Sequence, residues 1–226
     1  RAGEELSAAE AAVSVACLRM TNKEWCADQL LPGLGRASLD AKCALMRLLA
    51  QLGGAKALQA VRSAAQDASA PLQDAAIRAL ADWPGAAAAP DLLRSVRESE
   101  NASHRALAFR GYVRLSREAQ VPADSKCSML AGALDLAKAT DDKKLVLGAL
   151  GDVPAIESLR LAVRFVSEPD LADESGAAVV KIAGTLGEKH RQETAAALQQ
   201  VVKSAKSESV LGEARRLLGR LNPPAK

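Results

Sequence analysis

Basic residues recur at one position of a repeated motif, and this spacing could place positive charge on a single face. The motif has six copies, at steps of 31 to 38 residues. Its second position is occupied by Arg47, Arg78, Arg110, Gly148, Lys181 and Arg216. We call this the register position. If the equivalent positions share a face, the five cations form a row that could contact phosphates or an acidic protein strip.

A simpler interpretation of these cations stays open. Charge is common wherever a helix position is exposed, and a charged residue there needs no partner molecule. One helical turn later the equivalent residues have mixed charge, which weakens the positive electrostatic field of the row. They are Gln51, Asp82, Arg114, Asp152, Thr185 and Arg220. We therefore treat Arg47, Arg78, Arg110, Arg114, Lys181 and Arg216 as candidate partner-binding residues, with an exposed structural role as the alternative.

Two of the four cysteines have a spacing that suits a disulfide. Cys17 and Cys26 flank the short link Thr21-Asn22-Lys23 at nearly symmetric positions. In an antiparallel helix hairpin such positions face each other, within the Cα separation that a disulfide needs. Cys43 and Cys127 lie too many repeats apart to meet. The alternative is that all four are small buried apolar residues, as free cysteines often are.

The sequence holds no catalytic or metal-binding motif. Its two histidines, His104 and His190, are 86 residues apart, and we expect both on the surface. Ligand spacings such as H-E-x-x-H and C-x-x-C are absent, as are a G-x-S-x-G elbow and a P-loop. The carboxylates are scattered over expected helix surfaces. The sequence thus predicts no enzyme activity, no cofactor and no metal in this chain.

Composition disfavours nucleic acid as the main ligand. Thirty Lys and Arg residues against 27 Asp and Glu give a net charge of +3, which is too close to balance for a dominant phosphate footprint. Aromatic residues make up 2% of the chain, and their positions match a helical core rather than base-stacking platforms. They are Trp25, Trp83, Phe109, Tyr112 and Phe165.

The recurrence itself predicts the elements that carry these residues. A period of this length is typical of stacked helical hairpins, because one hairpin cannot bury its apolar face alone. We predict an all-α chain: an α-solenoid of about six antiparallel helix hairpins, forming a single array over residues 1–221. A capping helix is expected at 5–20 and a frayed tail at 222–226. The expected helix pairs are 24–35/40–52, 55–66/71–83, 87–98/102–117, 122–139/141–152, 154–167/172–186 and 189–204/208–221.

Several stretches resemble a known repeat family. Gly54–Leu58, Val61–Ala65, Leu72–Trp83 and Gly85 are similar to the short bacterial HEAT-like repeats of the phycobilisome-lyase type: an apolar first helix, a short turn, then an Ala-rich second helix ending in Gly. The resemblance covers about residues 24–221 and departs from the pattern near 119–145, where we expect an irregular turn and second helix. It implies a curved solenoid used mainly for binding, and it does not imply lyase chemistry.

Three function classes follow. The leading one is a non-catalytic protein-interaction or scaffolding module that binds a partner on the concave face lined by the second helices. The second is an accessory domain of a larger exported bacterial enzyme, whose partner is another domain of the parent chain. The third is nucleic-acid binding through the basic row. No apolar run is long enough to span a bilayer. The compartment stays open, with an extracytoplasmic one favoured, and the start at Arg1 indicates a processed or excised chain.

Overall fold

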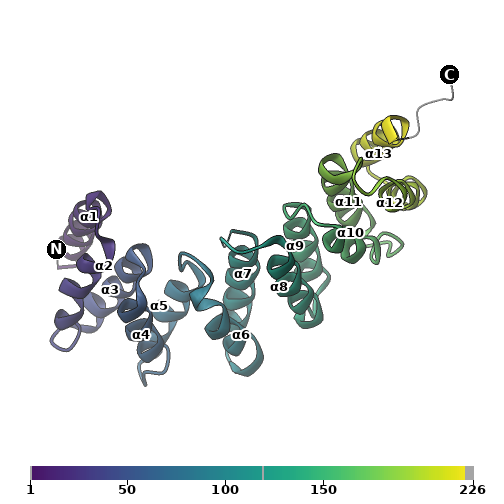
Figure 1. Ribbon diagram of the computed structural model, residues 1–226. Helices are drawn as coiled ribbons and strands as arrows, with labels where there is room; N and C mark the ends of the chain where they lie inside the picture. The colour runs from purple at the N-terminus through teal and green to yellow at the C-terminus, as the bar shows by residue number, and fades with distance from the viewer. Residues whose placement is uncertain (1, 119, 222–226) are drawn as a thin grey trace. The chain divides into compact units, whose positions relative to one another are not determined.

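The described residues form an all-α fold, as predicted. The structure is a computed structural model that describes residues 2–118 and 120–221, so the tail predicted at 222–226 lies outside the described residues. Within them the chain forms thirteen α-helices, two short 3-10 helices and no strand (Figure 1). The first α-helices are α1 Ala2–Arg19, α2 Lys23–Leu30, α3 Leu39–Leu52, α4 Ala55–Ala64, α5 Ala70–Ala81, α6 Ala89–Glu98 and α7 Ala102–Glu118.

The remaining helices continue the same alternation. They are α8 Ala123–Leu136, α9 Thr140–Gly151, α10 Ile156–Val163, α11 Ala172–Leu186, α12 Arg191–Ser204 and α13 Glu208–Leu221, and the 3-10 helices are η1 Leu31–Gly33 and η2 Ala86–Ala88. The predicted capping helix is α1, and the six predicted pairs run from α2/α3 to α12/α13. We call the even-numbered members of these pairs first helices and the odd-numbered members second helices.

The chain divides into two compact units, residues 1–115 and 116–226, with the boundary inside α7. In unit 1, α3 contacts α1 on one side and α5 on the other, while α2 contacts α4. In unit 2, α11 contacts α9 and α13, and α10 contacts α8 and α12. Each unit therefore has a layer of second helices beside a layer of first helices. A single array over residues 1–221 stays a prediction.

Local chemistry explains where the helices begin. The side-chain oxygens of Asn22, Ser38 and Asn101 accept backbone N–H bonds from Trp25 (2.9 Å), Ala41 (3.3 Å) and Ser103 (2.9 Å), respectively. Each of these bonds satisfies an N–H group that lacks a partner in the first helical turn. Asp141 lies in the first turn of α9 and does not cap that helix. At that end the backbone N–H of Ala139 donates to the Asp142 carboxylate at 3.3 Å.

The irregular segment predicted near 119–145 is also wrong where the structure describes it. Both α8 and α9 are continuous helices. The 38-residue step from Arg110 to Gly148 has two sources. α7 continues eight residues beyond Arg110, whereas α5 ends three residues beyond Arg78, and α8 has 14 residues where α6 has 10. The extra length is therefore helix, not loop.

The core is built from Ala, Leu and Val, with a few aromatic side chains. Trp83, Phe109 and Tyr112 are buried, as expected. Trp25 is not: half of it is exposed, and it lies in the first turn of α2. The core position predicted for Trp25 is wrong.

Small residues let neighbouring second helices approach closely. A Cβ added to Gly111 on α7 would lie 2.6 Å from the Ala81 Cα on α5, inside any real contact distance. A Cβ on Gly151 of α9 would lie 3.3 Å from the Ala178 Cα of α11. Side chains of ordinary size at these places would push the helix axes apart. The spacing of the second-helix layer is therefore set by glycine and alanine.

Gly111→Ala is expected to destabilise the chain by about 1–3 kcal/mol, because the added methyl group meets backbone rather than a movable side chain. Gly148→Ala is the matched control: Gly148 is inside α9, and a Cβ there would meet nothing within 4 Å. Alanine's higher helix propensity should make the control up to about 1 kcal/mol more stable. Urea unfolding followed by circular dichroism measures both, and a Gly111→Ala chain at least as stable as wild type would contradict the close contact.

Candidate binding surface on the second helices

The six candidate residues all lie on second helices, in two groups. Arg47 is on α3, Arg78 on α5, and Arg110 and Arg114 on α7, all within unit 1. Lys181 on α11 and Arg216 on α13 are in unit 2. Their side chains have different partners, which decide how much free charge each one presents.

Arg47 is tied to the preceding helix α1. Its Nε and Nη2 atoms donate to the two carboxylate oxygens of Glu10, at 2.7 Å and 2.5 Å. This forked pair raises the pKa of the Arg47 guanidinium. One turn further along, the Ser14 hydroxyl donates to the Gln51 side-chain oxygen at 2.6 Å. Both contacts fasten α1 to α3.

Arg78 and Arg216 are paired within their own helices. Arg78 Nε donates to Asp74 one turn earlier, at 2.8 Å, and this bond is the main cause of a lowered pKa for the Asp74 carboxyl. Arg216 Nε donates to Glu213 at 2.8 Å, which lowers the pKa of the Glu213 carboxyl in the same way. The net charge of each pair is close to zero.

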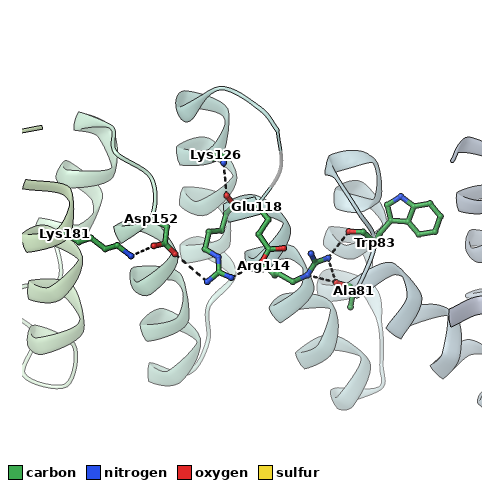
Figure 2. Close-up of polar contacts among 8 residues, drawn as sticks. Ala81, Trp83, Arg114, Glu118, Lys126, Asp152 and Lys181 are labelled. Carbon is green, nitrogen blue, oxygen red and sulfur yellow. Dashed lines mark hydrogen bonds and ion pairs between the residues drawn. The ribbon is translucent and has the colours of Figure 1, made fainter. Parts of the chain in front are cut away.

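Lys181 bridges α11 to α9 in unit 2. Its Nζ donates to the Asp152 carboxylate at the end of α9, as Figure 2 shows. Arg117 Nη1 lies 3.6 Å from the other oxygen of the same carboxylate. Asp152 is thus shared by two cations, and the register position again serves to connect neighbouring second helices.

Arg114 donates hydrogen bonds to backbone carbonyl groups. Its Nη2 donates to the carbonyl oxygens of Ala81 at 2.8 Å and Trp83 at 2.9 Å, and its Nε lies 3.2 Å from the Ala81 oxygen (Figure 2). These carbonyls lie at the C-terminal end of α5, where no intrahelical donor remains and the helix dipole favours a cation. Arg114 therefore holds α7 against the end of α5.

These contacts neutralise most of the charge of the basic row. Arg47, Arg78, Lys181 and Arg216 each lie against a carboxylate, so they do not present four bare positive charges. Arg110 is exposed on α7. Partner binding by these residues stays a prediction, but a continuous positive strip is not its physical basis.

A groove between α3 and α5 is the feature of unit 1 that the sequence analysis missed. It encloses about 380 Å³. Ala50, Ala75 and Ala79 contribute apolar surface, while Arg47, Arg78, Asp74, Asp82 and Gln51 supply charged and polar groups.

The Cys43 thiol also lines the groove and lies 3.6 Å from the Pro71 carbonyl oxygen. Burial raises the pKa of the Cys43 thiol, which disfavours the reactive thiolate. The groove suits binding better than nucleophilic chemistry.

A second cavity of about 280 Å³ opens on the other side of α5, between α4 and α6. The Arg62–Asp91 ion pair lies in its wall, with Arg62 Nε 2.9 Å from Asp91 Oδ2. His104 also lines this cavity, and its side chain is only 12% exposed, 3.6 Å from Asp74. The surface position predicted for His104 is therefore wrong, because α5 and the end of α6 cover it.

All four cysteines are free thiols in the structure. Cys26 is buried in the α1–α2 hairpin, where its Sγ donates to Met20 Sδ at 3.2 Å. Burial raises the pKa of the Cys17 thiol, and a hydrogen bond with the Cys26 thiol raises it further. The two sulfur atoms are therefore neighbours, as the spacing required. A disulfide between them stays a prediction.

No known protein family matches the chain, and no curated protein matches it in sequence. Among the residues that the structure describes, no group of three or more His, Cys, Asp or Glu side chains could hold a metal ion. None of the described helices combines the length and apolar character needed to cross a membrane.

Arg114→Met is expected to cost about 1.5–3 kcal/mol, because it removes charged hydrogen bonds to two carbonyl groups at the end of α5. Arg110→Met, one turn earlier on the same helix and exposed, should stay within about 0.5 kcal/mol of wild type. Urea unfolding at equal protein concentration compares them. Equal stability of the two variants would show that the bonds to Ala81 and Trp83 do not hold α7.

The Cys17–Cys26 pair should join when the native chain is treated with a mild disulfide oxidant. Trypsin cleaves after Arg19 and Lys23, so the two cysteines fall in separate peptides that only a disulfide would hold together. Mass spectrometry without reduction is expected to detect the linked peptides, while Cys43 and Cys127 remain alkylatable. Free, alkylatable thiols at both Cys17 and Cys26 would rule out the bridge.

Proposed function

We propose that this chain is a non-catalytic, HEAT-like binding module that holds a segment of another protein, or of another domain of its parent chain, on its second-helix surface. The observation that carries the proposal is the groove between α3 and α5. A concave site with apolar surface and a few convergent polar groups is the usual form of a binding site.

The groove favours a polypeptide as the ligand. Its alanines accept apolar side chains, and groups of both signs are available for hydrogen bonds to a peptide. Arg47 and Arg78 are already oriented by Glu10 and Asp74, so a partner finds them in place and little side-chain entropy is lost on binding. Many modest contacts of this kind sum to useful affinity on a repeat surface.

Nucleic acid has weaker support as the ligand. Binding to phosphates gains from the release of counterions around unpaired Lys and Arg residues. Carboxylates already neutralise Arg47, Arg78, Lys181 and Arg216 here, so phosphates would compete with those pairs. The groove holds Asp74 and Asp82 as well, which would repel a phosphate backbone.

Photo-crosslinking from inside the groove tests the proposal. A benzophenone amino acid replaces Gln51, which lines the groove, or Gln59, an exposed glutamine on α4 and the matched control. In extracts of the source cells, the Gln51 position is expected to capture a defined protein that the Gln59 position does not. Purified, that protein should bind the wild-type chain, and Gln51→Trp should weaken binding at least about tenfold by filling the groove, while Gln59→Trp should not.

Two results would overturn the proposal. One is capture of the same proteins from both positions, or of none. The other is crosslinking to nucleic acid from Gln51 that is lost as salt rises, since this would favour the phosphate-binding alternative.

A further inference from the structure

The face of α1 turned away from α3 is exposed in the described part of the chain, and large apolar side chains are exposed around it. Of the large apolar side chains exposed in the described residues, four lie on α1, in the turn after it or in the first turn of α2: Val15, Leu18, Met20 and Trp25. A helix face that meets water in a repeat array is normally polar. By contrast, the exposed residues of α13 include Glu208, Arg215 and Arg220.

The helical periodicity of α1 puts two sets of residues on opposite faces of the helix. Glu10 and Ser14 point toward α3, where they bind Arg47 and Gln51. The roughly opposite face carries, in order along the helix, Glu5, Ala8, Ala12, Val15 and Arg19, spaced by three and four residues. All five are exposed. This is the spacing of a helix-pairing seam, with an acid at one end and a base at the other.

That order of charges makes the face complementary to itself. If two copies of α1 pack antiparallel across a two-fold axis at Ala12, Glu5 and Arg19 lie equally far from the axis, about 10 Å along the helix. Glu5 of each copy then meets Arg19 of the other, and Ala8 faces the region of Val15 and Ala16. The small side chains at the centre allow the axes to approach to about 8 Å.

We propose that the outward face of α1 is a homodimer interface, in which two copies of this chain pack antiparallel with Ala12 at the two-fold axis. Leu18, on the same helix, is also exposed in the single chain. One helix pair buries an area at the low end for a specific interface, so a weak dimer is expected. The interface is separate from the groove between α3 and α5.

Sedimentation of the 226-residue chain from about 1 to 200 µM tests the dimer. The weight-average mass is expected to rise from 23.6 kDa toward twice that value. Ala12→Glu puts two like charges on the axis and should weaken association at least about tenfold. Ala196→Glu, an exposed alanine on α12, is the matched control and should leave association unchanged. Circular dichroism checks that each variant is folded.

A charge exchange tests the antiparallel alignment. Glu5→Arg and Arg19→Glu should each weaken the dimer about threefold to tenfold, because each brings like charges together. The double variant restores both ion pairs and should associate about as strongly as wild type. The proposal is overturned if wild type stays monomeric at 200 µM, if Ala12→Glu acts no more strongly than Ala196→Glu, or if the double variant is no better than the single ones.

Discussion

Close packing between successive second helices is the constraint on which the rest of each unit depends. A hairpin of about 25 residues cannot bury its own apolar face, so it needs the next hairpin against it. The contact of Gly111 with Ala81 shows how tight that packing is, since not even one methyl group fits between the backbones. Once the helix axes are this close, side chains on the exposed ridges of neighbouring helices come within reach of each other.

The charged residues follow from that proximity. Arg47 reaches Glu10 on α1, Lys181 reaches Asp152 on α9, and Arg114 reaches the last carbonyl groups of α5. The first-helix layer does the same, with Lys56 pairing with Asp28 and Arg160 with Glu193. Exposed ion pairs contribute little stability one by one. Their larger effect is on the surface, because they leave it with fixed, mostly neutral polar groups in place of a strong field.

A surface of this kind selects ligands by shape and hydrogen bonding more than by long-range attraction. The groove between α3 and α5 follows from the same packing: alanines bring the helices together, and the long side chains of Arg47, Arg78 and Gln51 stand beside the resulting depression. The outward face of α1 differs, because none of the described helices packs on it. It combines apolar exposure with opposite charges at its two ends, which is the arrangement that a symmetric contact uses.

Local patterns in the amino-acid sequence are enough to predict the helices, their pairing and their order. The apolar period and the capping residues are local properties, since Ser38 and Asn101 bind N–H groups only two or three residues further along the chain. The sequence could also place Cys17 beside Cys26, since a short hairpin link leaves little choice. Which groups the basic side chains contact depends on the tertiary structure. Glu10 is 37 residues from Arg47, and no pattern in either segment indicates that they meet. The burial of His104, the exposure of Trp25 and the groove likewise depend on which helix lies next to which, a distance in space that chain spacing does not encode.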